Sequence, residues 1–262
     1  MNRSAFSAET INVFRLMRRF FIDKTVIEGE SVILCGDEAR HIASVLRMSA
    51  GDELILINGS GNEMNARIQS VLKDEVALTV TGVSVCAAEP RNRVTLIQGL
   101  PKSDKLEFII QKCVELGVYA VFPVQMKRSV VKGERSANKI ERYNRVSHEA
   151  AKQCGRAYAP EVFTAASLKE CGLDRFDLVL LAYEDENENS LKSVLLSQKS
   201  ALPENADIAV IVGPEGGFEP SEVELVLSSN KNAFSVSLGS RILRTETAGM
   251  ALLAMLMYEL EG

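Results

Sequence analysis

The sequence has few of the residues on which metal centres and disulfide frameworks depend. It contains only two histidines, His41 and His148, among 262 residues, which argues against a histidine-rich metal site. Its five cysteines are odd in number, irregularly spaced and form no C-x-x-C pair. We therefore expect reduced thiols in a cytoplasmic protein that holds no metal.

Long apolar runs are also missing. No stretch approaches the roughly 20 apolar residues that a membrane-spanning helix needs, and 248-AGMALLAMLMY-258 is typical of a buried or interface helix. The first residues have no continuous apolar core of the secretory kind. Their arginines and serines leave a transit peptide as an alternative, but we favour a disordered extension over residues 1–16, with the first domain beginning near Met17. We expect no membrane partner.

Charge is unevenly distributed in this chain of net charge −5. Residues 91–160 hold 14 Lys and Arg against 6 Asp and Glu, a local net charge of +8, whereas residues 161–262 hold 7 against 17, a local net charge of −10. A solvated helix surface would explain such a basic segment. The size of the excess nevertheless favours a polyanionic partner.

The chain divides near residue 90. The first part predicts strands at 31–35, 53–58, 63–71 and 75–85, separated by turn signals. One helix is expected at 37–47, with Asp37 as its N-cap. Short strands at such close spacing favour a small β-barrel, which we assign to residues 17–88.

The second part, residues 91–262, alternates strands and helices. We predict strands at 94–100, 119–125, 177–183, 208–213 and 234–239, and helices at 104–117, 136–154, 190–198, 220–229 and 246–260. Five consecutive β-α units predict an α/β domain with a mainly parallel sheet and helices on both faces.

Three of these strands end in unusual loops: 181-LAYEDEN-187, 213-GPEGGF-218 and 238-LGSRILRTETAG-249. Ligands of open α/β sheets bind beyond the carboxyl ends of the strands, and glycines let the backbone approach a ligand closely. No lysine follows as in a Walker loop, and G-P-E-G-G is not G-x-G-x-x-G. A neutral or cationic ligand fits better than a phosphate beside Glu215, although a tight turn alone would also explain the glycines.

The third loop carries charged residues next to an apolar helix. Thr245 is expected to N-cap that helix and Glu246 to lie in its first turn, where the helix dipole favours a carboxylate. Arg241 and Arg244 have two explanations. They form surface charge or salt bridges to Glu215 or Glu246, or they contact a phosphate or a base beside a ligand pocket.

Several motifs together resemble one family. 17-MRRFF-21, 40-RHIASVLR-47, 101-PKSDKLEFIIQKCVELGV-118, 149-EAAKQCGR-156, 213-GPEGGF-218 and 238-LGSRILRTETA-248 occur in the order seen in the RsmE family. These proteins are bacterial 16S rRNA (uracil-N3)-methyltransferases of the SPOUT superfamily. The resemblance covers about residues 17–260, and the last two motifs are its most specific part.

The resemblance implies a fold and a cofactor. The first domain is expected to be a PUA-like β-barrel that grips RNA, and the second a SPOUT methyltransferase domain with a trefoil knot. Family members are homodimers that bind S-adenosylmethionine in the knot loops. The cofactor-binding residues implied here are Leu181, Ala182, Tyr183, Glu184, Gly213, Pro214, Glu215, Gly216, Gly217, Leu238, Gly239, Ile242 and Leu243.

The implied reaction needs cations more than it needs a metal. Uracil N3 must lose its proton, after which negative charge spreads onto the flanking carbonyl oxygens and must be stabilised. Arg156, Arg241 and Arg244 are the candidates for that role, although a position at a helix end would by itself explain Arg156. The general base stays unassigned, because His148 is a lone residue on a helix face and Glu246 already has a structural explanation.

RNA contacts are expected from basic residues outside the cofactor loops. They would bind phosphates of 16S rRNA in the small ribosomal subunit without reading sequence, although simple solvation explains any one of them equally well. The candidates are Arg18, Arg19, Arg47 and a basic loop at residues 127–139, of which Lys127 and Arg128 are singled out.

Two rival functions remain to be compared. A dehydrogenase-like nucleotide-binding enzyme would carry G-x-G-x-x-G after the first strand of the α/β domain, where this chain has 99-GLPK-102. A non-catalytic RNA-binding module would have degraded cofactor loops, whereas all three loops keep the family motifs. Binding of S-adenosylmethionine would separate this second alternative from the enzyme.

Overall fold

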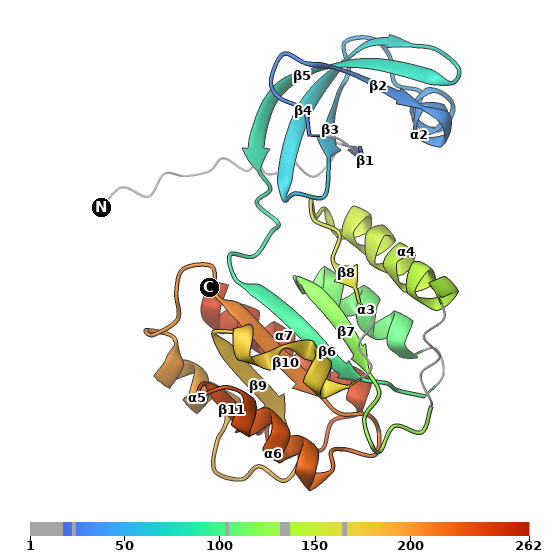
Figure 1. The fold of residues 1–262 in the computed structure, drawn as a ribbon. Helices are drawn as coiled ribbons and strands as arrows, with labels where there is room; N and C mark the ends of the chain where they lie inside the picture. Colours follow the sequence, from blue (N-terminus) through green and yellow to red (C-terminus); the bar gives the residue numbers. More distant parts are fainter. Residues whose placement is uncertain (1–17, 23–24, 103–104, 132–136, 164–166, 262) are drawn as a thin grey trace. The chain divides into compact units, whose positions relative to one another are not determined.

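The computed structural model describes residues 18–22, 25–102, 105–131, 137–163 and 167–261 (Figure 1). The chain forms two compact units. One comprises Met1–Glu89 together with Gly155–Tyr158, and the other comprises Pro90–Cys154 together with Ala159–Gly262. The extension expected at residues 1–16 lies outside the described residues.

The N-terminal unit is built on a five-stranded sheet. Its strand order is β1 (Arg19–Phe21), β3 (Glu53–Ile57), β4 (Asn62–Val71), β5 (Glu75–Val85) and β2 (Ser31–Cys35). The pairings are antiparallel except that of β1 with β3. In β2 the residues alternate strictly between exposed and buried, so Val32 and Leu34 face the core, as the period of two of a half-buried strand requires.

Four of these strands confirm the predicted segments, and β1 was missed because three residues hold too little pattern. The predicted helix at 37–47 is α2 (Gly36–Arg40) followed by a π-helical turn, η1 (His41–Val45). The N-cap is Cys35 rather than Asp37. Asp37 lies in the first turn and forms an ion pair with Arg40 instead.

The C-terminal unit has a six-stranded parallel sheet. Its strand order is β11 (Ala233–Val236), β9 (Leu178–Ala182), β10 (Asp207–Val212), β6 (Arg93–Gly99), β7 (Ala120–Val124) and β8 (Glu161–Val162). The helices are α3 (Lys105–Glu115), α4 (Ala137–Cys154), α5 (Leu191–Gln198), α6 (Pro220–Ser229) and α7 (Thr245–Glu261). The five predicted β-α units are confirmed, and only the two-residue β8 was missed.

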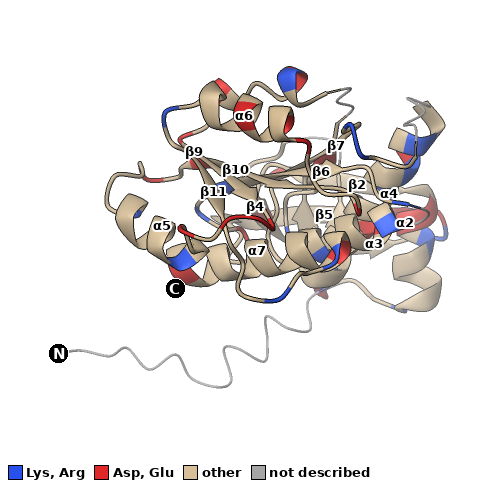
Figure 2. Cartoon of the chain, turned by 90° about the horizontal axis from the view of Figure 1, so that it is seen from below, with Lys and Arg blue, Asp and Glu red and all other residues tan. Residues whose placement is uncertain are grey.

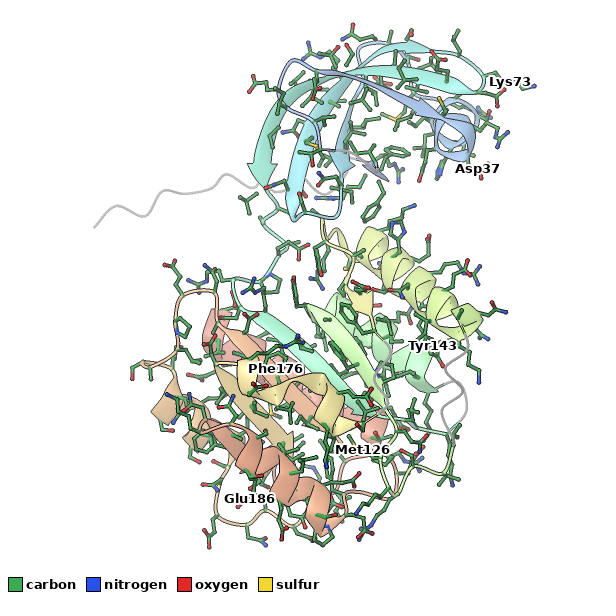
Figure 3. All side chains as sticks on the ribbon, viewed as in Figure 1. Asp37, Lys73, Met126, Tyr143, Phe176 and Glu186 are labelled. Atoms are coloured by element: carbon green, nitrogen blue, oxygen red, sulfur yellow. The ribbon has the colours of Figure 1, made fainter. Side chains whose placement is uncertain are left out.

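Helices cover both faces of this sheet. Residues of α3, α4, α5 and α7 pack on one face with Leu96 of β6. On the other face, Ile97 packs with α6 and with the turns η2 (Leu168–Cys171) and η3 (Leu173–Arg175). Met126 and Phe176 belong to this second core and are labelled in Figure 3. Successive residues of one strand therefore enter different cores, which explains why β6 shows no regular alternation of polar and apolar residues.

The sheet brings three loops together. Because β11, β9 and β10 are neighbours and parallel, their carboxyl ends lie at one edge. The segments after Ala182, Val212 and Val236 therefore meet there, although the sequence separates them by 30 and 24 residues. The trefoil knot implied for this region stays a prediction.

Candidate active-site pocket

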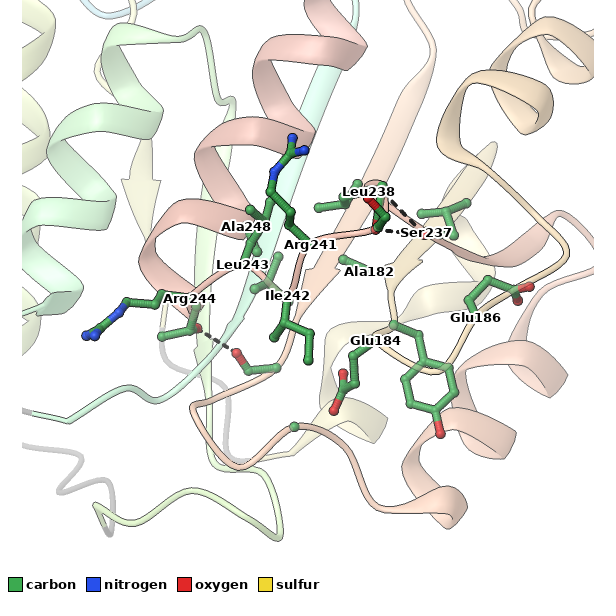
Figure 4. Close-up of a pocket in the computed structure, with 18 of the residues that line it drawn as sticks. Ala182, Glu184, Glu186, Ser237, Leu238, Arg241, Ile242, Leu243, Arg244 and Ala248 are labelled. Atoms are coloured by element: carbon green, nitrogen blue, oxygen red, sulfur yellow. Dashed lines mark hydrogen bonds between the residues drawn. The ribbon is translucent and has the colours of Figure 1, made fainter.

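A cavity of about 790 Å³ lies where the three loops meet. Of the thirteen residues implied as cofactor-binding, twelve line it: Ala182, Tyr183, Glu184, Gly213, Pro214, Glu215, Gly216, Gly217, Leu238, Gly239, Ile242 and Leu243. Leu181 does not, because its side chain is fully buried in the core on the α6 face of the sheet. Figure 4 shows the labelled lining residues around the pocket.

The glycines of the middle loop let neighbouring segments pack closely against it and leave its backbone groups accessible from the pocket. A Cβ at Gly213 would lie 3.0 Å from the Phe218 ring, and one at Gly216 would lie 2.9 Å from the backbone oxygen of Arg128. Gly217 has a φ of +69°, a conformation that favours glycine. The loop thus needs its glycines to fit between neighbouring segments, in addition to presenting backbone groups to the pocket.

Lys105, which lines the pocket, joins the pocket residue Glu215 to Glu246 in the first turn of α7. Its Nζ lies 3.0 Å from Glu215 Oε1 and 3.2 Å from Glu246 Oε2. Partial burial raises the pKa of Glu215, but hydrogen bonds from its own backbone N–H and from Lys105 lower it below the ordinary value on balance. Hydrogen bonds to Glu215 and Glu246 raise the pKa of Lys105. Sequence reasoning missed Lys105, whose only signal is its place in the motif after the first strand of this unit.

Arg241 and Arg244 remain available at the pocket. Both are exposed and line it, and their side chains diverge in Figure 4. Among the residues that the structure describes, neither forms an ion pair with Glu215 or Glu246, whose cation is Lys105. The pKa of Glu246 is lowered by its own backbone N–H, by Lys105 and by the charge of Arg244. Neither arginine lies at ion-pair distance from these carboxylates, so surface charge and contact with a ligand stay as the two explanations.

Glu186 organises the loop after β9. Its Oε1 accepts hydrogen bonds from the backbone N–H groups of Glu188 (2.7 Å) and Asn189 (2.9 Å), and its Oε2 accepts one from the Ser235 hydroxyl. Burial raises the pKa of this carboxyl, but the hydrogen bonds outweigh burial and lower it to about 2. Glu186, labelled in Figure 3, therefore holds the pocket-lining segment against β11. Sequence reasoning gave it no role.

Thr245 does not N-cap α7. It is the first residue of that helix, and its hydroxyl donates a 2.6 Å hydrogen bond to the backbone oxygen of Gly213. The same hydroxyl accepts a 2.8 Å bond from Gln98 Nε2. Thr245 therefore links the start of α7 to the glycine loop, a role that depends on residues far away in the sequence.

Arg156 is not among the residues that line this pocket. Arg156 belongs to the N-terminal unit and is 3% exposed. Its Nη2 lies 2.8 Å from Glu89 Oε2, and the other oxygen of that carboxylate accepts the backbone N–H groups of Ala157 and Tyr158. These contacts give Arg156 a structural role, and its catalytic role stays a prediction.

The predicted RNA-binding residues lie in different surroundings. Arg18 and Arg47 are exposed, whereas Arg19 is ion-paired with Glu63 at 2.9 Å. Lys127 Nζ donates to the Ser221 hydroxyl. The contacts of Arg19 and Lys127 account for where these two side chains lie. RNA binding by the predicted residues stays a prediction.

Arg128 connects the basic segment to the pocket loop. Its Nε lies 2.8 Å from Glu219 at the start of α6, and its Nη1 donates to the backbone oxygen of Gly216. The residues 132–136 of the predicted basic loop lie outside the described residues. Lysines and arginines of the following helix, α4, are coloured blue in Figure 2.

Other site types receive no support from the described part of the chain. It contains no group of three or more His, Cys, Asp or Glu placed to hold a metal ion, and none of its helices is long and apolar enough to cross a membrane. The five cysteines, all of them described, form no disulfide. Burial raises the pKa of the Cys113 thiol to about 12, so that thiol is a core residue and not a nucleophile.

Comparisons with known proteins agree with this architecture. The RNA methyltransferase domain matches residues 88–257, and the RNA methyltransferase PUA domain matches residues 34–81. Ribosomal RNA small subunit methyltransferase E of Bacillus subtilis is 36% identical over 252 residues, which cover 94% of this chain and 98% of that protein. The protein of the same name from Rickettsia conorii is 33% identical over 90% of this chain and 93% of its own length.

A solved structure extends the comparison to the fold. Ribosomal RNA small subunit methyltransferase E from Neisseria gonorrhoeae, bound to S-adenosyl methionine, matches with a TM-score of 0.77 at 28% identity, over 92% of this chain and 97% of that one. Fold, pocket and matches together define an RNA methyltransferase with a PUA-like sheet and an α/β domain. The chain belongs to the ribosomal RNA small subunit methyltransferase E (RsmE) family.

Proposed function

We propose that this chain transfers a methyl group from S-adenosylmethionine to N3 of a specific uridine in 16S rRNA of the small ribosomal subunit. The observation that carries the proposal is the pocket formed by the loops after β9, β10 and β11 in a chain of the RsmE family. Relatives are named for methylation of small-subunit rRNA, and the Neisseria gonorrhoeae structure is bound to S-adenosyl methionine.

The residues present fit this cofactor in size, polarity and charge. A cavity of about 790 Å³ lies in the range of small-molecule sites. Leu238 lines it, and Ile242 is 90% exposed at its rim, so both can cover an apolar ring. The carboxylates of Glu184 and Glu188 also line it, and they suit a ligand that carries a sulfonium and an ammonium cation.

When bound, S-adenosylmethionine supplies an activated methyl group. The protein must hold uracil N3 in line with that group, which requires an unpaired or flipped base because N3 lies on the pairing edge. Arg241 and Arg244 line the pocket without ion pairs to Glu215 or Glu246. We assign to Arg241 and Arg244 the stabilisation of the negative charge that develops on the uracil carbonyl oxygens after N3 loses its proton.

RNA binding is assigned to both units. Arg18, Arg19 and Arg47 would bind phosphates from the N-terminal unit, with residues 17–88 acting as the RNA-gripping domain. Lys127 and Arg128 would bind phosphates beside the pocket loops of residues 91–262. Backbone phosphates carry most of the affinity in such complexes, so binding should weaken as salt rises.

A homodimer in the cytoplasm completes the proposal. Met255 is 45% exposed and Tyr258 is 83% exposed on α7, a helix whose other face packs in the core. Exposed apolar residues that gather on one element are typical of an interface. Sedimentation analysis of the wild-type protein and of Tyr258→Glu would test whether this helix joins two copies.

Methyl transfer tests the function directly. Wild-type protein is incubated with labelled S-adenosylmethionine and small subunits from a strain that lacks the modification, and the digested rRNA is analysed by mass spectrometry. We expect N3-methyluridine. Cofactor binding without transfer to rRNA would overturn the substrate, and absence of cofactor binding would leave the alternative of a non-catalytic RNA-binding module.

A further inference from the structure

A buried chain of side-chain hydrogen bonds lies beneath the glycine loop. Gln98 ends the apolar run of β6, and its Nε2 donates to the hydroxyl of Thr245 at 2.8 Å. That hydroxyl donates to the backbone oxygen of Gly213 at 2.6 Å, the dashed bond beside Arg244 in Figure 4. These hydrogen bonds join β6, α7 and Gly213, the first residue after β10. Gln98 and Thr245 are 147 residues apart in the sequence.

The neighbouring atoms determine which group donates and which accepts in each of these hydrogen bonds. Gln98 Nε2 also lies 3.0 Å from the backbone oxygen of Gly99, which can only accept a hydrogen bond. The amide nitrogen must therefore face this side and donate to Thr245 as well. The one proton of the threonine hydroxyl is then left for Gly213, so the hydroxyl acts as an oriented donor.

A contribution to folding stability does not explain why a glutamine occupies position 98. The residue is fully buried, and its Oε1 is the one buried side-chain atom without a hydrogen-bond partner among the residues that the structure describes. An unpaired buried acceptor opposes folding. A leucine would fill a core position of this size without that cost. The amide is therefore better explained by what its nitrogen does for Thr245.

The hydroxyl of Thr245 acts on the peptide group at which the loop leaves the strand. The parallel pairing of β10 ends at Val212, and Pro214 has no N–H to donate. The Gly213 carbonyl thus lies beyond the regular ladder and is held by a side chain. Gly99 allows this approach, because a Cβ there would lie 2.6 Å from the backbone nitrogen of Pro214.

We propose that Thr245 is a positioning residue for the cofactor pocket, whose hydroxyl, oriented by Gln98, holds the Gly213 peptide group so that the Gly213–Gly217 loop is preformed. The proposal rests on the proposed function, since it concerns the affinity of that loop for S-adenosylmethionine. A loop that is already ordered loses less conformational freedom on binding.

Calorimetric titration of S-adenosylmethionine into purified full-length variants tests this role. We expect Thr245→Val, which keeps the shape but loses the hydroxyl, to raise Kd about tenfold, since an unpaired buried acceptor corresponds to roughly one to two powers of ten in an equilibrium constant. Thr245→Ser should restore Kd to near the wild-type value. Thr247→Val, at an exposed position two residues later, should leave it unchanged.

Gln98→Leu provides the second, independent variant. It removes the donor to Thr245 together with the unpaired Oε1, so we expect a raised Kd with an unchanged urea midpoint, a combination that a merely structural role would not produce. Wild-type affinity in Thr245→Val or in Gln98→Leu would overturn the inference alone. Failure of the wild-type protein to bind S-adenosylmethionine would overturn the proposed function and this inference with it.

Discussion

Replacement of Glu89 by glutamine is expected to destabilise the N-terminal unit by about 3 to 5 kcal/mol, the range for breaking one partner of a buried ion pair. Glu89 Oε2 accepts from Arg156 Nε at 3.1 Å and from Nη2 at 2.8 Å. Glu89 Oε1 accepts the N–H groups of Ala157 at 2.8 Å and Tyr158 at 2.9 Å. An amide has one acceptor oxygen, so one of these two sets would face an NH₂ group.

The loss should be large because the partner cation cannot reach water. The Arg156 side chain is 4% exposed and that of Glu89 is 13% exposed, so the guanidinium would stay buried beside a neutral amide in place of the Glu89 carboxylate. Urea unfolding of the full-length variant, followed by circular dichroism, measures the change. A loss of this size is a large fraction of the roughly 5 to 15 kcal/mol that stabilises a typical domain.

A surface pair in the same unit provides the matched control. Glu53 and Arg67 lie 2.8 Å apart, but their side chains are 49% and 54% exposed. Glu53→Gln should therefore cost less than about 1 kcal/mol. If Glu89→Gln cost no more than this control, the reasoning about the buried pair would be refuted. Arg156→Met combined with Glu89→Gln should cost less than the two single changes added together, since the pair acts as one unit.

Three further predictions concern the pocket. Gly99→Ala places a Cβ 2.6 Å from the backbone nitrogen of Pro214, so we expect a loss of about 1 to 3 kcal/mol in urea unfolding and weaker S-adenosylmethionine binding by calorimetry. Arg244→Ala should lower kcat about a hundredfold or more, as for loss of one charge-stabilising group, with Kd for the cofactor unchanged. The pKa of Glu186 is lowered from 4.5 to about 2, so its stabilising effect is present above pH 4.5 and is lost as pH falls towards 2.

Each of these predictions has a control and a contrary outcome. Gly82→Ala, where the nearest atom lies 4.0 Å away, should change neither stability nor affinity, and an equally mild Gly99→Ala would contradict the packing argument. Lys231→Ala, at an exposed position before β11, should keep wild-type kcat, and wild-type kcat in Arg244→Ala would remove that arginine from the mechanism. Glu186→Gln should reduce the loss of unfolding free energy as pH falls from 4.5 to about 2. A loss identical to that of the wild type would contradict the assignment of this pH dependence to Glu186.

Local sequence signals located the pocket loops but not the contacts that hold them. Glycines and arginines after three strands are read directly along the chain, and twelve of the thirteen residues implied as cofactor-binding line the cavity. Lys105 was missed because its partners Glu215 and Glu246 lie 110 and 141 residues later. Leu181 was included because its position on the inward face of β9 cannot be told from its neighbours.

The surroundings of Arg156 also could not be foreseen from the sequence. Its place at the end of a basic helix and within a family motif made it a catalytic candidate. Its ion pair is with Glu89, 67 residues earlier, and no periodicity connects the two positions. Burial of a charged side chain depends on which distant segment covers it, so the sequence alone did not show that Arg156 is buried in an ion pair.

The order of elements and the family could be read from the sequence, because hydrophobic periodicity and short motifs are local properties of the chain. It placed the β-α units to within a few residues and predicted the loops that line the pocket. The strand order β11-β9-β10-β6-β7-β8 and the partners of each charge became known from the folded chain. Strand pairing, burial and ion pairing join residues across distances in sequence over which local preference carries no information.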